Sequence, residues 1–473
     1  MPDALTGQGN PTGRGNQTGQ DDFPDRQGLT DQIAHWIADQ GSHPMTGSDR
    51  ATASLGFADC IAVLHAGWSD PVACQLRRIA GISGWNSPLA VPHLASGTLA
   101  LHLAVAAHVL DYDDTAFGCH PSAVLVPTLL AAVAHRPVSG ARLLAAYAAG
   151  YETWAELSAR EPASVHRKGW HPSAVYGPVA ATAALCALEG CAADITGMAL
   201  SLAASMSGGL VAQFGTAAKP WQLGRAAAAG HEALDLAQAG MRAAPDALEH
   251  PLGFLAALSP DGQVRRGGPV ALGAHMGTYG LNLKLYPTCY AMHRALDGMA
   301  ALRPKLPPLD QIHRVLAEIG ATQAQILRHH HPETGAQARF SLEFGLAAML
   351  LRGRLGLAEL EEAFIASPEI RALLPKITTR QVEGRHALEP SLTACDRVIV
   401  ETAQGTLDSG PVALPLGHFT NPAPGIDSKL NDCLTASPLD PDQVAKLLRL
   451  LDDPGAMAST AALVSPITEA PLA

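Results

Sequence analysis

Apolar segments rich in alanine dominate the first 280 residues and restrict the folds that this chain can adopt. Leu99, Leu103, Ala106 and Leu110 recur at steps of four, three and four, which is the spacing of one helix face. Alanine also has the highest helix propensity of the residues. The sequence therefore predicts an all-helical domain over residues 29–279. Its alanine-rich segments lie at 123–134, 141–150, 178–188, 198–206 and 225–240.

Glycine is expected to mark the ends of several of these helices, as at Gly150 and Gly190. After about residue 280 the pattern changes. Residues 312–321 and the segment RVIVETAQGTLDSG resemble strands, and Gly405 is placed to close a hairpin in that segment. Residues 341–353 resemble a buried helix between them.

We therefore predict a mainly α fold, with a smaller α+β domain inserted late in the chain over residues 280–416. From about residue 417 to 473 the chain is expected to return to the helical domain. The first 28 residues are rich in Gly, Asn, Gln and Asp, which predicts a disordered tail and no secretory signal.

Composition excludes several classes of function. The formal net charge of -11 argues against a nucleic-acid partner, for which a basic face is expected. No apolar run approaches the roughly 18 residues of a membrane span. Eight scattered cysteines without a CxxC pair indicate free thiols in a reducing cytoplasm. Only 16% of residues are charged, which indicates a large core or a subunit interface, and we expect a homodimer.

The sequence HPSAV occurs twice, at residues 120–124 and 171–175, and each copy leads into an apolar helix. Proline is favoured at the first helical position, so His120 and His171 are expected just before helix N-termini. The helix dipole there disfavours imidazolium and favours a nearby anion. A neutral histidine in that place is a usable general acid or base. A simple capping signal explains the same pattern and remains open.

Three acidic residues, Asp111, Asp113 and Asp114, crowd the end of the helix before the first HPSAV. Crowding should raise the pKa of at least one of these carboxyl groups. An ordinary solvated turn explains the same cluster equally well. Lys219 and Lys284 stand alone in apolar surroundings. Each either neutralises a substrate carboxylate or extends along the surface with its charge in water.

We expect no metal. The three aspartates lack the regular spacing of oxygen ligands in a hard-cation loop. The adjacent histidines in residues 328–333 point in different directions on any helix or strand. The sequence also has no P-loop, no dinucleotide fingerprint and no GxSxG elbow.

Five segments taken in order resemble the MmgE/PrpD family, from about residue 30 to 450. They are DYDDT with HPSAV, GWHPSAVYG, GTAAKPWQLGRAA, LKLYPTCYAMH and ETGAQARFSLEFGLAAMLLRG. The resemblance implies a helical large domain, a smaller α+β lid domain, a dimer, and cofactor-free chemistry beside carboxylates. Family members include dehydratases, decarboxylases and epimerases. The residues matching the decarboxylase-type active site are Asp111, Thr115, His120, His171, Lys219 and Lys284.

Two departures from the animal decarboxylases of this family affect the end of the pocket that selects the substrate. The loop from Thr115 to His120 is one residue shorter, and a pocket tyrosine falls at or near Ile326. Thr115 itself is expected to hydrogen-bond the substrate.

The resemblance implies a lyase, a dehydratase or decarboxylase, that forms an enolate or carbanion on a small di- or tricarboxylic acid. His120 and His171 would transfer protons, while Lys219 and Lys284 would hold carboxylates and stabilise the enolate. Asp111 would orient a histidine or a lysine. An epimerase or isomerase of a polycarboxylate, and a family member that only binds its ligand, remain as alternatives.

Overall fold

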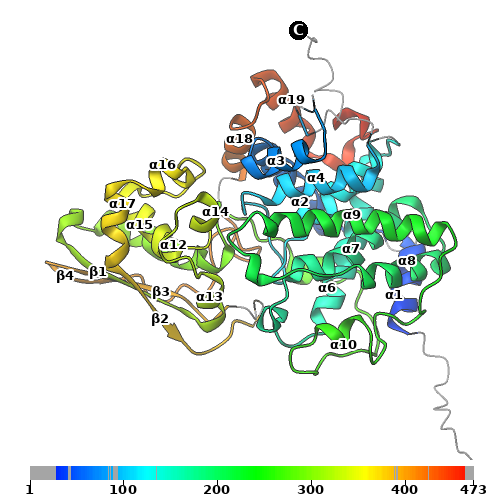
Figure 1. The fold of residues 1–473 in the computed structure, drawn as a ribbon, viewed down its shortest axis with the longest axis horizontal. Helices are drawn as coiled ribbons and strands as arrows, with labels where there is room; N and C mark the ends of the chain where they lie inside the picture. The colour runs from blue at the N-terminus through cyan, green and yellow to red at the C-terminus, as the bar shows by residue number, and fades with distance from the viewer. Residues whose placement is uncertain are drawn as a thin grey trace, which may run out of the picture.

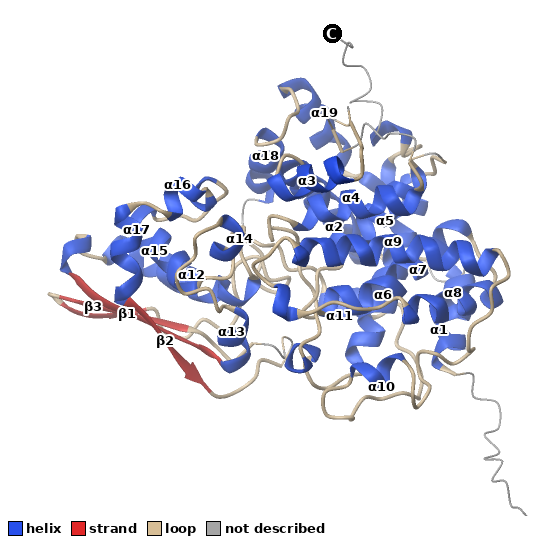
Figure 2. Cartoon of the chain, viewed as in Figure 1, coloured by secondary structure: helices blue, strands red, loops and turns tan. Residues whose placement is uncertain are grey.

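The computed structural model describes residues 28–463, apart from 41–43, 84, 86, 89–93, 135, 388, 390–391 and 424–425. The predicted disordered tail lies outside the described residues except for Gly28. The described fold is mainly helical, as predicted, and its four-stranded sheet belongs to the smaller of two parts (Figure 2). No helix among the described residues combines the length and apolarity needed to cross a membrane.

The larger part is a bundle in which α4, α7 and α9 form the centre, because α9 packs against both of the others. One apolar core joins these helices and continues into the C-terminal helices, which pack on α2 (Figure 1). The bundle contains α1 (Leu29–Ala38), α2 (Gly47–Gly67), α3 (Pro71–Ile79), α4 (Ser96–His108), α5 (Ser122–Val133), α6 (Gly140–Ala159), α7 (Pro172–Glu189), α8 (Ala193–Ser205), α9 (Ala218–Gln238), α10 (Phe254–Leu258), α11 (His275–Tyr279), α18 (Ile426–Thr435) and α19 (Pro441–Asp452).

The two glycines that were expected to end helices behave differently. Gly190 follows the last residue of α7 with φ +70°, as predicted. The prediction for Gly150 was wrong, because this residue lies inside α6. A Cβ atom there would come within 2.6 Å of Leu125 on α5 and 2.9 Å of the Ala180 carbonyl on α7. Gly150 therefore permits close packing of three helices.

The smaller part is a sheet in the order β2-β1-β3-β4, with helices on one face (Figure 1). β1 pairs in parallel with β2, which the sequence had not predicted, and antiparallel with β3, while β3 and β4 form the predicted hairpin. Val398 and Val400 are buried in a second apolar core. The elements are β1 (Ile312–Gly320), β2 (Ile377–Val382), β3 (Arg397–Thr402), β4 (Gly405–Asp408), α12 (His293–Leu302), α13 (Ala321–Ile326), α14 (Gly335–Ala338), α15 (Leu342–Arg352), α16 (Glu362–Ile365) and α17 (Pro368–Leu373).

Candidate active site

A cavity lies where the bundle meets the smaller part, and the predicted residues converge on it. Every predicted site residue except Lys284 lines its wall, and Lys284 lies behind Asp111, fully buried. The lining consists of Asp111, Thr115, Gly118, His120, His166, His171, Ser173, Phe214, Lys219, Cys289, Tyr290, Ala291, Ile326, Phe340, Glu389 and Leu392.

Asp111 follows α4 and adopts φ +49°, a conformation that costs energy for a residue with a side chain. Its backbone N–H donates to the His108 carbonyl at 3.0 Å. Lys284 Nζ donates to the Asp111 carbonyl at 2.9 Å and forms an ion pair with its carboxylate. Lys219 Nζ lies 3.4 Å from the other carboxylate oxygen. Two buried ammonium groups therefore hold this strained residue in place.

The charges in this cluster determine which groups stay ionised. Burial opposes ionisation of Asp111, but Lys219 and Lys284 hold its pKa well below the ordinary value. Burial also works against the charge of Lys284, yet Asp111 and Asp113 raise its pKa. For Lys219, burial prevails and lowers the pKa. Lys284 is therefore a fixed charge, and Lys219 is the more titratable lysine that faces the cavity.

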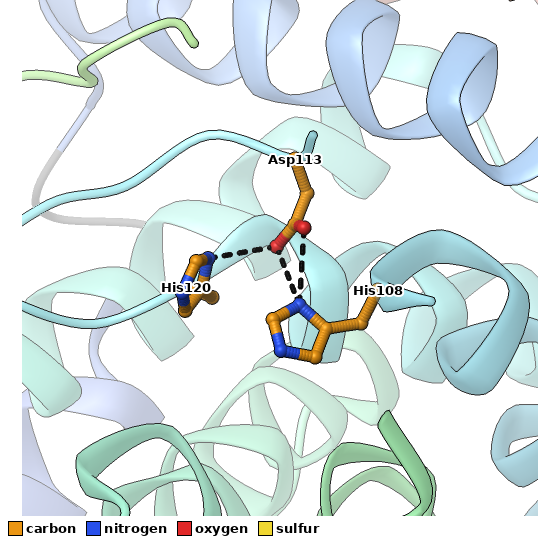
Figure 3. Close-up of side chains that lie close together, drawn as sticks. All are labelled: His108, Asp113 and His120. Carbon is orange, nitrogen blue, oxygen red and sulfur yellow. Dashed lines mark hydrogen bonds and ion pairs between the residues drawn. The ribbon is translucent and has the colours of Figure 1, made fainter. Parts of the chain in front are cut away.

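Asp113 contacts two imidazoles at once (Figure 3). Both of its carboxylate oxygens lie 3.0 Å from His108 Nδ1, and one lies 2.9 Å from His120 Nδ1. Burial raises the pKa of Asp113, but the two histidines outweigh it and hold that pKa well below the usual range. Asp113 is therefore a buried carboxylate that accepts a hydrogen bond from His108 and lies at ion-pair distance from His120 Nδ1.

The contacts of His108 fix its tautomer. Lys219 Nζ lies 2.5 Å from His108 Nε2, and since an ammonium has only donors, this nitrogen must accept. His108 Nδ1–H then donates to Asp113. Burial lowers the pKa of His108 to about 3, which keeps the ring neutral. A continuous chain runs from Lys219 through His108 to Asp113 and His120.

His120 has one nitrogen available to a substrate. Its Nδ1 faces Asp113, and its Nε2 lies 3.9 Å from an Asp111 oxygen beside the cavity. Burial lowers the pKa of His120, while Asp113 opposes that shift. A proton taken up at Nε2 would therefore be stabilised by two neighbouring carboxylates.

His171 is oriented by an amide. Its Nδ1 lies 2.7 Å from Gln222 Oε1, and Gln222 Nε2 in turn donates to the Leu210 carbonyl at 3.3 Å. His171 must therefore carry its proton on Nδ1, which leaves Nε2 as an acceptor with no hydrogen-bond partner. Burial, followed by Lys219, holds the pKa of His171 well below its ordinary value.

The two HPSAV copies are not equivalent. His171 is the N-cap of α7 with a proline at the first helical position, as predicted, whereas α5 begins one residue later, at Ser122. Neither helix has a side-chain cap hydrogen bond, so the histidine side chains are not capping groups. Instead the copies are joined, because the His120 backbone N–H donates to Ser173 Oγ at 3.0 Å.

The buried side chain of Lys429 connects the loop after α4 to the C-terminal helices. Lys429 on α18 lies 2.5 Å from an Asp59 oxygen on α2 and donates to the Tyr112 carbonyl at 2.7 Å. Burial, reinforced by Asp59, raises the pKa of Asp114 well above its usual value. The pKa of Asp114 is thus raised, as expected for one aspartate of the cluster, but its main causes are burial and Asp59 rather than crowding within the cluster.

Sequence reasoning missed three residues of the site. His108 lies in an apolar helix without a motif, and Asp113 was noted only as part of an acidic cluster. Glu389 comes from a segment without periodicity, and it accepts from Asn282 Nδ2 at 2.9 Å. Burial raises its pKa to about 7. A histidine five residues before an aspartate at a helix end was the available signal for the first two.

The donor atoms of His108, Asp113 and His120 lie within 4.8 Å of one another, as metal ligands could. However, both imidazoles contact the carboxylate directly at hydrogen-bond distance. An ion bound between Asp113 and His108 Nδ1 would need the lone pair of a nitrogen whose proton is donated to that carboxylate. The arrangement fits a hydrogen-bonded relay better than a metal centre.

Comparison with known proteins adds a family to this geometry. The MmgE/PrpD N-terminal domain model matches residues 31–266, and the MmgE/PrpD C-terminal domain model matches residues 286–449. A cis-aconitate decarboxylase from Mus musculus is 29% identical over 290 residues, 58% of this chain and 58% of the relative. The match thus spans less than two thirds of that relative.

Two fungal relatives align over more of the chain. A cis-aconitate decarboxylase from Aspergillus terreus is 24% identical over 433 residues, covering 83% of this chain and 86% of the relative. A cis-aconitate decarboxylase-like protein from Aspergillus oryzae is 25% identical over 422 residues, covering 82% and 86%.

Proposed function

The chain belongs to the MmgE/PrpD family, and on that premise we propose that it is a cofactor-independent lyase acting on a small di- or tricarboxylic acid. The reaction passes through an enolate or carbanion beside a carboxylate. The observation that carries the proposal is the convergence of Asp111, His120, His171 and Lys219 on one cavity. The names of the relatives, which are cis-aconitate decarboxylases, support the same class of reaction.

His120 is the proton carrier in this proposal. Its Nδ1–H faces the Asp113 carboxylate, which orients the ring and stabilises the imidazolium formed when Nε2 accepts a proton. His171 has only the neutral Gln222 amide behind it, so it gains no comparable stabilisation. His171 therefore stays neutral, and its Nε2 is placed to accept a hydrogen bond from a hydroxyl group of the substrate.

Lys219 stabilises the negative charge that develops beside the reacting carbon. A donor already held in a buried site needs little reorganisation when charge forms, which is the main source of electrostatic catalysis. Lys284 does not line the cavity and instead positions Asp111. Thr115 lines the cavity, and its hydroxyl has no hydrogen-bond partner among the described residues, so we assign it to substrate binding.

Two outcomes are compatible with these roles. In decarboxylation the bond to a departing carboxylate breaks, carbon dioxide leaves and the electron pair remains as the enolate. His120 Nε2 takes a proton from water and delivers it to the carbon. In dehydration His120 removes the proton and hydroxide leaves from the neighbouring carbon.

The test is incubation with a panel of di- and tricarboxylates in deuterium oxide, followed by mass spectrometry and NMR. A lyase gives a product lighter by carbon dioxide or water. If every substrate is recovered without exchange or mass loss, the proposal is wrong.

An epimerase is a second candidate, because imidazoles from two different segments, His120 and His171, line the same cavity. Two groups on opposite sides of one carbon could remove and return a proton on different faces. Inverted substrate that carries deuterium, without mass loss, would identify this outcome.

A further inference from the structure

A groove between the two parts of the molecule adjoins the cavity. The groove shares Asp111, Lys219 and Phe340 with the cavity. Its other walls come from the ends of α2 and α4, the starts of α3 and α9, residues 357–362 and the segment 334–340 around α14, which lies at the boundary between the two parts in Figure 1. The carboxylates of Asp70, Glu361 and Glu362 are among the lining groups. Arg339, directly after α14, lines this groove.

Arg339 differs from every other buried cation that the structure describes. The other buried arginines and lysines each form an ion pair, namely Arg160, Lys219, Lys284, Arg294 and Lys429. Arg339 is only 8% exposed, yet its guanidinium has no ion pair and no hydrogen bond to a described residue. Its Nε is buried without a partner. A buried unpaired charge is costly, which is a reason to look for an absent anion.

The backbone around Arg339 is fixed, so the side chain is presented from a defined position. Its N–H donates to the Gly335 carbonyl at 3.1 Å, and its own carbonyl accepts from the Cys289 N–H at 2.9 Å. Cys289 and the next residue, Phe340, both line the cavity. Burial lowers the pKa of Arg339, with partial opposition from Asp70 and Asp111.

The balance of charge shows why a polycarboxylate needs this residue. At the cavity, the positive charges of Lys219 and Lys284 are matched by the carboxylates of Asp111 and Asp113. The pKa values of the cavity histidines His120 and His171 are lowered, so they add little positive charge. A substrate with several carboxylates would therefore lack a cation in the cavity alone.

We propose that Arg339 binds one carboxylate of a tricarboxylic acid in the groove while the reacting end lies beside Lys219 and His120. This inference rests on the proposed function and adds a preference for three carboxylates over two. A guanidinium fits a carboxylate with two parallel N–H···O bonds, a geometry that an ammonium cannot reproduce.

The experiment measures binding by calorimetry, with propane-1,2,3-tricarboxylate and glutarate as unreactive probes that differ by one carboxylate. Arg339→Gln should weaken tricarboxylate binding about 10- to 100-fold, the usual effect of losing a charge-assisted hydrogen bond. Glutarate binding should change less than about threefold. Arg339→Lys should recover only part of the tricarboxylate affinity. Arg380→Gln is the matched control, because it removes an exposed arginine from the same part of the molecule.

Thermal melting separates binding from structure. Because Arg339 is buried without a partner, Arg339→Gln should keep or raise the melting temperature. Equal loss of both probes with a lowered melting temperature, or tricarboxylate affinity within twofold of wild type, would overturn the inference. Failure of wild type to bind the tricarboxylate would overturn it too. If the tricarboxylate binds in an Arg339-dependent way but no acid is turned over, the proposed lyase activity is refuted while the Arg339 binding site is supported.

Discussion

Replacing His120 by glutamine tests the proposed relay most directly. Glutamine keeps hydrogen-bonding groups but cannot carry a proton at neutral pH. The side chain contributes one contact to Asp113, at 2.9 Å, while His108 keeps its two. The link from the His120 backbone N–H to Ser173 does not depend on the side chain. The structural loss is therefore a single buried contact.

These contacts set the two expected magnitudes. Losing one buried hydrogen bond costs about 0.5–1.5 kcal/mol of unfolding free energy. The unfolding entropy is about 2 cal/mol/K per residue, so the melting temperature should fall by only about 1–2 °C. Losing general acid–base catalysis should instead reduce turnover by roughly 10²–10⁴-fold.

The assay compares kcat and melting temperature of wild type, His120→Gln and a control, His231→Gln. His231 is also buried and contacts the Thr128 carbonyl at 3.1 Å, but it does not line the cavity. The control should keep wild-type turnover. The reasoning would be refuted if His120→Gln melted many degrees lower while retaining more than about a tenth of wild-type kcat.

Four further predictions concern the site and the assembly. His171→Gln removes the buried contact with Gln222 and should lower the melting temperature by only about 1–2 °C, while kcat/KM falls by up to about tenfold, the effect of one hydrogen bond to substrate; unchanged kcat/KM would contradict the assignment. Burial raises the pKa of Glu389 to about 7 from 4.5, so the folded state keeps a proton that the unfolded chain releases. The free energy of unfolding should therefore fall by up to about 3 kcal/mol as pH rises from 4.5 to 7, and denaturant titrations should show no such fall in Glu389→Gln. Turnover should survive EDTA, and a loss reversed by one divalent ion would show that a metal is required. Light scattering should give a homodimer of the 49.1 kDa chain, and a monomer at micromolar concentration would contradict it.

The fold was predictable where local pattern and tertiary packing agree. The alternation of Val398 and Val400 predicted a strand, and both are buried in the sheet. Leu110 continued the helical spacing, yet α4 ends at His108 because the chain must turn to place Asp111 against two lysines. Gly150 misled the prediction because its role is close contact between helices, which no local pattern records.

The site was predictable as a set of residues but not as a network. His120 and His171 were identifiable from a repeated motif, and Lys219 from its isolation in an apolar segment. His108 carried no local signal, since its role depends on contacts with Asp113 and with Lys219, 111 residues further along the chain. The unpaired state of Arg339 could not be inferred either, because a missing partner is a property of the folded surroundings.

The contact of Lys429 with Asp59 and the Tyr112 carbonyl has a consequence for biosynthesis. The loop that carries Asp111 is completed by a lysine more than 300 residues further along the chain. During translation the bundle would emerge first, with Asp59 lacking its counter-charge until α18 leaves the ribosome. A chain stopped before α18 would keep an uncompensated buried carboxylate beside an unsupported loop. We therefore expect ordering of the site to be among the last events of folding.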